Sequence, residues 1–372
     1  GKVLFKQMEK KMNKEVFFVI GSLGGKGWGG AHRVICILAN YLAEKGYPVT
    51  IIVWRDSPVD YPLDKAINII WLHCKVNKEI DMIKPCIKTR EILKEHSGAY
   101  LYAFMSRMAT YARIYTVGLN VKVIGSERTD PRTEPHNVVF RMIRNHMFGF
   151  MYRTVYQTPD ALAYFPKRAQ KNGCVIPNPI TPNLPERYQG IRKKEFVTFC
   201  RIDRQKNLPM MIDSFIQVHF RYPEYKLKIY GTGLIEEEIK NYIKDKQADE
   251  FILMEGFSNR VHESILDCAG FLSSSDYEGL SNSMLEAMAI GLPCVCTDCP
   301  IGGAHMMIQD GINGLLVPVK DVSAMRDAII ELIENPNLGE RMSIEAEKVK
   351  RLLDEKVICK KWEALLFEEN ER

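Results

Sequence analysis

Short apolar segments alternate with amphipathic segments along most of the chain, and this alternation constrains the fold more than any other feature. The segments that we predict as buried strands are Val16–Ile20, Val49–Trp54, Tyr100–Met105, Val121–Gly125, Phe196–Cys200, Lys226–Tyr230, Phe251–Met254, Gly270–Ser273 and Pro293–Thr297. The segments that we predict as helices are Arg33–Lys45, Asn137–Thr154, Leu208–Arg221, Leu234–Lys246 and Ser283–Ile290. Residues Ala161–Phe165 are placed near a strand or turn. Two series of strand–helix–strand units predict two α/β, Rossmann-like domains, each with a parallel sheet between helices.

The segment Ile176–Pro185 separates the two series. It contains four prolines, which cannot continue a helix or a central strand. A chain of 372 residues also suits two domains better than one. We therefore expect an N-terminal domain over residues 12–180 and a C-terminal domain over 190–356, with residues 1–11 left aside. The amphipathic segment 357–372 is expected to form a helix that packs back toward the N-terminal domain.

Composition and charge exclude some classes of protein. No apolar run approaches the roughly 18 residues that a membrane-spanning helix needs. The ten cysteines are scattered, which fits a reduced cytosolic protein better than a disulfide framework. Cys294, Cys296 and Cys299 lie close together, but no second Cys or His pair with ligand spacing follows them, so we expect no metal site.

The charge is unevenly distributed along the chain. Residues 1–190 contain 28 Lys and Arg against 15 Asp and Glu, whereas residues 191–372 contain 23 against 31. A basic half suggests that the first domain meets a polyanion, for which nucleic acid, an anionic membrane surface and a phosphorylated substrate are candidates. A solvated basic face is the alternative.

Two glutamates, Glu278 and Glu286, flank the start of a predicted helix. Between them, the amides of Ser281, Asn282 and Ser283 are expected at the helix N-terminus, which favours phosphate binding. Because carboxylates accept hydrogen bonds from sugar hydroxyls, the pattern suggests a site for a sugar joined to a phosphate. The alternative is a capping box, in which Ser283 caps the helix and Glu286 bonds back to the backbone.

Three further clusters follow predicted strands, where open parallel sheets bind their ligands. The glycine-rich segment Gly21–Ala31 permits a close backbone approach, although it is neither a P-loop nor a dinucleotide fingerprint. Arg201 and Lys206 follow the first strand of the second domain and could converge on a diphosphate. The segment Tyr230–Gly233 allows a close approach to a nucleotide.

In this order and spacing, Arg201 with Lys206, Tyr230–Gly233, the glutamate pair and Asp310–Val317 resemble retaining glycosyltransferases of the GT-B fold, glycosyltransferase family 4. The resemblance covers nearly the whole chain from about Glu15 and is most specific over residues 270–320. The segments Gly125–Pro131 and Cys299–Ala304 are similar to bacterial enzymes that build O-antigens, capsules and lipid-linked oligosaccharides. The implied fold is GT-B, with two Rossmann-like parallel-sheet domains facing a central cleft.

The resemblance also implies roles for individual residues. Arg201 and Lys206 would hold the donor diphosphate, Glu278 would contact the transferred sugar and Glu286 would bind the ribose. The amides of Ser281 and Asn282 would face the phosphates, Gly231 would approach the nucleotide, and Gly29 and Gly30 would close on the donor. The residues that could meet the acceptor or a phosphate are Arg107, Glu127, Arg128 and Arg132. Such enzymes usually need no metal.

Some positions differ from the family pattern. Cys200 replaces a usual Gly, His32 a usual Glu and His305 a common Arg, while Ser126–Arg128 stands where the family has a His. The role of that His therefore cannot be transferred.

The resemblance implies transfer of a hexose or N-acetylhexosamine from a UDP-sugar, with retained configuration, to a polyprenyl-diphosphate-linked saccharide, without cofactor or nucleic acid. We expect a cytoplasmic enzyme, peripheral on the inner face of the cytoplasmic membrane. The segment Asn137–Thr154 could supply the membrane contact through Arg141, Arg144, Arg153, Phe140, Met147, Phe148 and Phe150. The alternative is that several of its apolar residues belong to the core. The alternatives are another GT-B nucleotide-sugar enzyme such as an epimerase, or an inactive partner subunit. A phosphorylase is disfavoured because this chain shows no lysine in a recognisable pyridoxal setting. An NAD-dependent oxidoreductase is less favoured because the glycine-rich segment lacks the dinucleotide fingerprint.

Overall fold

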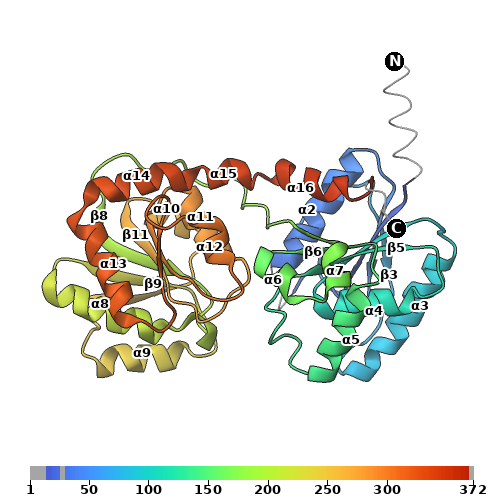
Figure 1. Cartoon of the computed structure of the whole chain (residues 1–372), viewed down its shortest axis with the longest axis horizontal. Coiled ribbons are helices and arrows are strands. Elements are labelled where there is room, and N and C mark those ends of the chain that lie inside the picture. Colours follow the sequence, from blue (N-terminus) through green and yellow to red (C-terminus); the bar gives the residue numbers. More distant parts are fainter. Residues whose placement is uncertain (1–13, 26–29, 368–372) are drawn as a thin grey trace, which may run out of the picture. The chain divides into compact units, whose positions relative to one another are not determined.

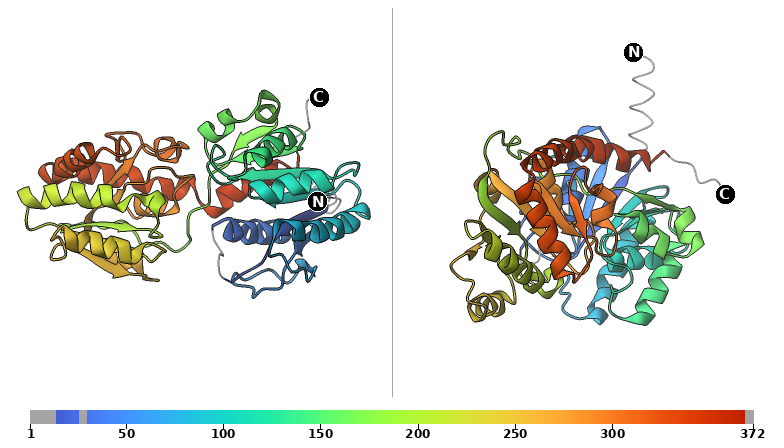
Figure 2. Two further views of the ribbon diagram at one scale, coloured as in Figure 1. Left: turned by 90° about the horizontal axis from the view of Figure 1, so that it is seen from below. Right: turned by 60° about the vertical axis from the view of Figure 1, so that its left-hand side comes forward.

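The computed structural model describes residues 14–25 and 30–367. The chain divides into two units, one made of Gly1–Pro179 with Glu355–Arg372 and the other of Ile180–Asp354. Each unit has its own sheet, with helices packed on both faces (Figures 1 and 2).

The first unit contains a seven-stranded sheet in the order β3-β2-β1-β4-β5-β6-β7, in which all paired strands are parallel. The strands are β1 (Val16–Ile20), β2 (Val49–Val53), β3 (Asn68–Trp71), β4 (Tyr100–Phe104), β5 (Lys122–Glu127), β6 (Arg153–Tyr156) and β7 (Gly173–Val175). The central strands β1 and β4 are buried along their whole length, as expected for strands covered on both faces. Phe18 of β1 and Tyr102 of β4 stack with ring centroids 5.0 Å apart.

The helices of the first unit lie on opposite faces of this sheet. They are α2 (Gly30–Glu44), η1 (Glu79–Met82), α3 (Ile83–Lys94), α4 (Ser106–Tyr115), α5 (Val138–Phe148), α6 (Pro159–Tyr164), α7 (Lys167–Lys171) and α16 (Glu355–Ala364). Strand order reverses at β1, and right-handed crossovers then place α3, α4 and α5 together on one face. Helix α4 packs against both α3 and α5, and α16 packs against α2.

Helix α16 is fastened to the first unit by buried contacts. The Trp362 side chain is 1% exposed, and the Tyr102 hydroxyl donates to the Trp362 carbonyl at 3.0 Å. The hydroxyls of Tyr41 and Tyr47 each donate to the Glu363 carboxylate at 2.9 Å. Helix α16 therefore contributes to the core of the first unit.

The second unit contains a six-stranded parallel sheet in the order β10-β9-β8-β11-β12-β13. Its strands are β8 (Lys193–Phe199), β9 (Lys226–Tyr230), β10 (Ile252–Gly256), β11 (Cys268–Ser273), β12 (Cys294–Thr297) and β13 (Leu315–Val317). Its helices are η2 (Arg204–Lys206), α8 (Leu208–Arg221), α9 (Glu236–Asp245), α10 (Val261–Ile265), α11 (Asn282–Ala289), α12 (Gly303–Met307), α13 (Val322–Glu334), α14 (Pro336–Glu347) and α15 (Val349–Leu352). This strand order is that of a doubly wound dinucleotide-binding sheet.

The structure corrects three predicted elements. The helix predicted over Asn137–Thr154 ends at Phe148, because Gly149 is its C-cap and Arg153 already belongs to β6. Residues Pro159–Tyr164 form a helix where we placed a strand or turn. Helix α11 (Asn282–Ala289) begins one residue earlier than predicted, with Ser281 as its N-cap.

The burial pattern also corrects part of the predicted membrane-contact segment. Arg144 and Phe148 are completely buried, so neither contributes to a surface. Within residues 14–25 and 30–367, no helix has the length and hydropathy that a bilayer span requires.

Candidate functional site

Two loops meet where the strand order of the second unit reverses. Strand β8 pairs with β9 on one side and with β11 on the other, so the loops after β8 and β11 leave the same edge and diverge to opposite faces. Such a switch point is where open α/β sheets bind ligands. The loop after β8 contains Arg201 and Lys206, and the loop after β11 contains Glu278.

Lys206 and Glu278 form an ion pair at this switch point. The two side chains are only 15% and 18% exposed. Burial disfavours the charged amine, but the neighbouring Glu278 carboxylate outweighs it, so the pKa of Lys206 is raised. The same carboxylate accepts hydrogen bonds from Ser275 Oγ at 3.2 Å and from Gln205 Nε2 at 3.2 Å. The site therefore holds a charged cation ready for an anionic ligand.

Hydrogen bonds between the two loops hold this pair in place. Ser274 Oγ donates to the carbonyls of Lys206 and Asn207 at 2.8 and 3.0 Å. Asn207 adopts a left-handed conformation with φ of 43°, and its Nδ2 donates to Asp276 Oδ1 at 2.8 Å. The Asp276 amide donates to the Gln205 carbonyl at 3.0 Å. Because both loops are tied along their length, the position of Lys206 is set by the backbone.

Arg201 lies on the same loop but in a different environment. Its side chain is 73% exposed, and Nε donates to Asp203 Oδ2 at 2.6 Å. The guanidinium thus has an anchored end at Nε, while the rest of the group is accessible to a ligand.

A cavity of about 340 Å³ lies beside Arg201. Its lining residues are Phe199, Cys200, Arg201, Tyr230, Gly231, Thr232, Phe257, Ser258 and Val261. Gly231 has a φ of +130°, and a Cβ there would lie 1.9 Å from the Cys200 carbonyl oxygen. Only glycine therefore lets the loops after β8 and β9 run close enough to form this wall. Burial raises the pKa of the Cys200 thiol to about 11, so it is neutral at physiological pH.

Glu286 has partners that the sequence did not indicate. Its carboxylate accepts from Thr181 Oγ1 at 2.5 Å and lies 2.9 Å from His262 Nε2. The His262 ring packs edge-on against Phe199, with centroids 5.5 Å apart, which places the group next to the cavity wall. The capping-box alternative is wrong, because the N-cap is Ser281, whose Oγ accepts from the Met284 amide at 3.3 Å. Glu286 is therefore not at the N3 position.

Sequence reasoning missed His262, Thr181 and Phe257. His262 lies in the five-residue helix α10, which has no periodic signal, and Thr181 lies in the proline-rich segment. The position of Phe257 directly after β10 was the one available signal, since strand ends point to ligands. Among the described residues, no group of three or more His, Cys, Asp or Glu could hold a metal ion.

The first-unit residues Glu127 and Arg144 form a completely buried pair, with Arg144 Nη1 3.3 Å from Glu127 Oε2. Glu127 also accepts from Ser106 Oγ at 2.6 Å and from the Arg128 amide at 3.0 Å. Arg144 donates to the carbonyls of Pro131 and Glu134 at 2.7 and 2.6 Å. Glu127 is therefore enclosed by hydrogen bonds from α4, α5 and the loop after β5.

Arg128, Arg132 and Arg107 differ in exposure. Arg128 is 9% exposed, donates to Asn178 Oδ1, and has a pKa that burial lowers to about 10. Arg132 donates to both oxygens of the Asp130 carboxylate, from Nε at 3.0 Å and from Nη2 at 2.7 Å. Arg107 is exposed and lines a cavity.

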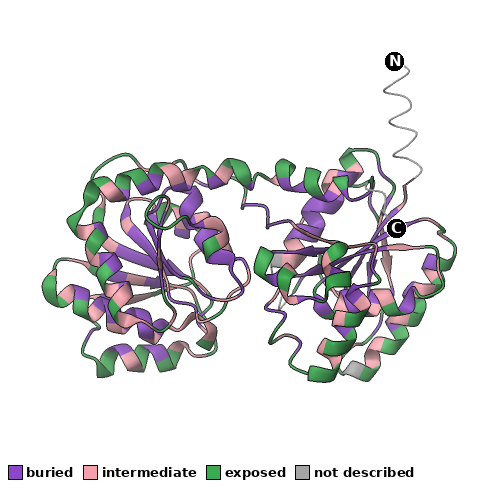
Figure 3. Ribbon diagram, viewed as in Figure 1, coloured by how far each residue is buried: buried purple, intermediate pink, exposed green. Residues whose placement is uncertain are grey.

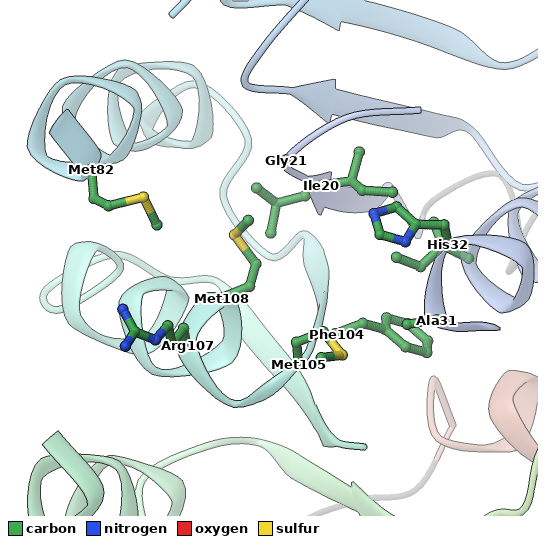
Figure 4. Close-up of a pocket in the computed structure, with 11 residues that line it drawn as sticks. Ile20, Gly21, Ala31, His32, Met82, Phe104, Met105, Arg107 and Met108 are labelled. Atoms are coloured by element: carbon green, nitrogen blue, oxygen red, sulfur yellow. The ribbon is translucent and has the colours of Figure 1, made fainter. Parts of the chain in front are cut away.

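This first-unit cavity has a volume of about 200 Å³ and lies between the ends of β1 and β4. Its lining residues are Val19, Ile20, Gly21, Ala31, His32, Ile35, Met82, Phe104, Met105, Arg107 and Met108 (Figure 4). The lining is mostly apolar, with His32 from α2 and Arg107 from α4 as its cationic or titratable members. Burial lowers the pKa of His32, so its ring is neutral near pH 7. Gly30 begins α2, and Gly29 lies outside the described residues.

Residues 187–349 match the family model described as glycosyl transferases group 1. This matched range lies within the second unit, which is therefore similar to a glycosyltransferase group 1 domain. Arg201, Lys206, Gly231, Glu278, Ser281, Asn282 and Glu286 all lie within this group 1 domain.

Relatives of known sequence extend the similarity beyond the group 1 domain. An uncharacterized glycosyltransferase of Haemophilus influenzae is 24% identical over 355 residues, covering 95% of this chain and all of the relative. The N-acetylgalactosamine-N,N'-diacetylbacillosaminyl-diphospho-undecaprenol 4-alpha-N-acetylgalactosaminyltransferase of Campylobacter jejuni is 23% identical over 362 residues, covering 90% of this chain and 95% of the relative. The similarity to these two relatives supports the assignment of this chain as a glycosyltransferase.

Solved structures share the architecture. Anabaena Alr3699/HepE in complex with UDP matches with a TM-score of 0.79 and 15% identity, over 95% of this chain and 99% of that one. TarM also matches with a TM-score of 0.79, at 14% identity over 95% and 99% of the two chains. With the two parallel sheets, these neighbours show that the fold is GT-B.

Proposed function

We propose that this chain is a retaining glycosyltransferase that moves a hexose or N-acetylhexosamine from a UDP-sugar to a saccharide on a polyprenyl diphosphate. The observation that supports this most is the buried pair of Lys206 and Glu278 at the switch point of the group 1 domain. It puts a cation for a diphosphate beside a carboxylate for sugar hydroxyls. The name of the Campylobacter jejuni relative includes a diphospho-undecaprenol substrate, and Alr3699/HepE was crystallised with UDP.

In the proposed ground state, the donor diphosphate binds between Arg201 and Lys206. Lys206 then exchanges part of its interaction with Glu278 for the phosphate, which frees the Glu278 carboxylate to accept from a sugar hydroxyl. Glu286, held by Thr181 and His262, is assigned to the ribose. The cavity lined by Phe199 and Phe257 is assigned to the base, which can stack on aromatic rings.

In the proposed reaction, the bond between the anomeric carbon and the diphosphate oxygen breaks while the acceptor oxygen attacks the same face. The departing phosphate takes the proton of the acceptor hydroxyl, so the reaction balances without another reactant. Arg201, Lys206 and the first amides of α11 stabilise the negative charge that grows on the diphosphate. The proposal assigns this task to the chain's own cations and includes no metal ion or organic cofactor.

The acceptor side is assigned to the first unit, with the enzyme peripheral on the cytoplasmic face of the membrane. Arg107, which is exposed and lines the apolar cavity, is the candidate for the acceptor phosphate. Glu127 and Arg128 are buried, and of the two exposed residues Arg107 and Arg132, Arg107 takes precedence because it lines this cavity. The proposal involves no nucleic acid. Another nucleotide-sugar reaction such as epimerisation, or a catalytically inactive partner subunit, is the alternative.

The test is a panel of nucleotide sugars incubated with a polyprenyl-diphosphate saccharide, with products identified by mass spectrometry and the new anomeric configuration by NMR. We expect one UDP-sugar to be transferred with its configuration retained, and the Lys206→Ala variant to lose this activity. Inversion would overturn the retaining assignment. Conversion of a donor without transfer to any acceptor would favour the epimerase reading.

A further inference from the structure

Exposed apolar side chains gather on α3, α4 and α5 and on the residues next to these helices, including η1, and we call this surface the α3–α5 face. Its members are Ile80, Ile83, Ile87, Ile114, Val117, Val138, Val139, Met142, Ile143 and Phe150, with exposed fractions from 37% to 68%. Ile80, Ile83 and Ile87 follow helical spacing and thus form one stripe. Figure 3 shows exposed turns along these three helices. An apolar face of this extent commonly marks an interaction site.

The same three helices are strongly basic. They contain the eight cations Lys84, Lys88, Arg90, Lys94, Arg107, Arg113, Arg141 and Arg144 and one acidic residue, Glu91, and the adjoining η1 adds Glu79 and Asp81. Arg144 is buried with Glu127, and Lys94 pairs with Glu91. Because cations outnumber acids in these elements, the face has a net positive charge around its apolar residues.

Cations and aromatic rings are interleaved at the edge of this face. The Arg168 guanidinium lies 3.6 Å from the centroid of the Phe150 ring, and Arg113 lies 6.0 Å from it. Arg107 lies 5.5 Å from the Phe140 centroid, and Tyr111 packs edge-on against the same ring at 5.5 Å. Apolar rings with basic groups held beside them suit the boundary between lipid headgroups and acyl chains.

We propose that the α3–α5 face docks on the surface of an anionic lipid bilayer. The isoleucines and Met142 enter the headgroup–acyl boundary, and the Lys and Arg side chains contact lipid phosphates. A symmetric dimer through this face would bring like charges together, whereas an anionic bilayer neutralises them. This inference rests on the proposed lipid-linked acceptor, because Arg107 belongs both to this face and to the first-unit cavity.

The test is co-sedimentation of the full chain with vesicles of phosphatidylcholine alone or mixed with phosphatidylglycerol. We expect binding to the mixed vesicles that falls steeply with salt, and weak binding to phosphatidylcholine alone. The variant Lys84→Ala/Lys88→Ala should bind the mixed vesicles roughly 30-fold more weakly. The variant Ile83→Gln/Val139→Gln/Met142→Gln should bind about tenfold more weakly or worse.

A matched control replaces exposed apolar residues of the second unit, Ile191 and Phe220, which are 95% and 94% exposed. The variant Ile191→Gln/Phe220→Gln should bind vesicles as the wild type does. Equal binding to both vesicle types, or unchanged binding of the α3–α5 variants, would overturn the proposal. A wild-type dimer that dissociates in these variants would also overturn the proposal, because a second copy of the chain would then cover the face.

Titration calorimetry with UDP separates this proposal from the proposed function. All surface variants should bind UDP like the wild type, since none of these residues lies at the donor site. Loss of vesicle binding with UDP affinity intact assigns the effect to docking. If the wild-type protein bound vesicles but not UDP, the proposed donor site would be wrong. The proposed docking surface would still be supported.

Discussion

The pair of Lys206 and Glu278 shows how one contact couples stability to function. On the sequence alone, loop residues should be replaceable without cost to folding. The structure places both side chains at less than one-fifth exposure, and removing one partner of a buried pair leaves a charge without its counter-ion. Stability and activity are therefore expected to change together at this site.

We expect Lys206→Ala to lower turnover by about 10²-fold or more, because a donor to the developing negative charge is lost. It should also destabilise the second unit by about 3 kcal/mol, whereas Lys206→Met with Glu278→Gln should recover most of that loss. Urea unfolding and initial rates measure the two effects. Full stability in the single variant would show that the pair is solvated in solution. The matched Arg201→Ala variant should lower turnover similarly without destabilisation, because Arg201 is 73% exposed.

The raised pKa of Lys206 also has a pH consequence. A base whose pKa is higher in the folded than in the unfolded protein stabilises folding below the unfolded value of 10.5 and loses that contribution as pH rises through the folded pKa. The difference in unfolding free energy between wild type and Lys206→Met should therefore be constant at neutral pH and shrink above pH 10.5. A difference that stays constant into strong alkali would contradict the assignment.

Glu286 provides a second test at this scale. Its two partners, Thr181 and His262, hold the carboxylate at the cavity wall, so Glu286→Ala should weaken UDP binding by about tenfold or more, as expected for a charge-assisted hydrogen bond. Titration calorimetry with UDP measures the loss. Ser283→Ala is the matched control on the same helix. It removes a hydrogen bond to the N-cap Ser281 and no contact to Glu286, so it should leave UDP affinity unchanged. Unchanged UDP affinity in Glu286→Ala would remove it from the donor site.

Between elements, close backbone approaches determine where the site loops lie. The amide of Glu278 donates to the Pro300 carbonyl at 2.6 Å, and the amide of Ile301 donates back to the Glu278 carbonyl at 2.8 Å. Gly303 at the start of α12 lies against Gly279, so that a Cβ would be 2.1 Å from the Gly279 carbonyl oxygen. The loop that contains Glu278 is thus held in place by these contacts with the segment after β12.

We expect Gly303→Ala to shift this loop and cost about 1–3 kcal/mol, the usual range for overpacking. Gly339→Ala in α14 is the matched control, because its Cβ would meet only Pro293 at 3.6 Å and alanine favours helix. The control should be neutral or stabilising, by about 1 kcal/mol at most. Urea unfolding and UDP-sugar turnover are measured for both variants. Equal stability and equal turnover in the two variants would contradict the packing argument.

At the scale of the whole molecule, the two units depend differently on chain order. The second unit is one continuous stretch, Ile180–Asp354, whereas the first is completed by residues that follow it. Trp362 and Leu366 of this returning segment are at most 1% exposed. The stability of the first unit therefore depends on the segment that contains Trp362 and Leu366.

We expect Trp362→Ala to lower the unfolding free energy of the first unit by about 3–5 kcal/mol, as for large-to-small changes in a core. The second unit should unfold as before, and UDP affinity should persist. Calorimetry of the thermal transitions, assigned with UDP as a stabilising ligand of the second unit, distinguishes the two. Leu352→Ala, at a residue that is 62% exposed, should change neither transition by more than about 0.5 kcal/mol. A single shift shared by both units would contradict independent folding.

The sequence by itself determined the strands and the motifs at their ends. Apolar runs such as Phe196–Cys200 predict parallel strands through local periodicity, and charged or glycine-rich residues directly after them predict the ligand-binding edge. Strand order then brings Arg201, Lys206 and Glu278 to the same edge, because carboxyl ends of parallel strands are neighbours. Short strands such as β7 (Gly173–Val175) have too few residues to show a period.

Only the tertiary structure decided which side chains meet. Thr181 and His262 contact Glu286 across 105 and 24 residues of chain, and no local pattern encodes such a contact. Likewise, Glu127 looked like a ligand-binding acid in a polar segment, yet α5 brings Arg144 onto it and buries both. Periodicity reports how a residue relates to its sequence neighbours. Burial and pairing depend on how whole elements pack, and this packing separates the reactive side chains from those that only hold the fold.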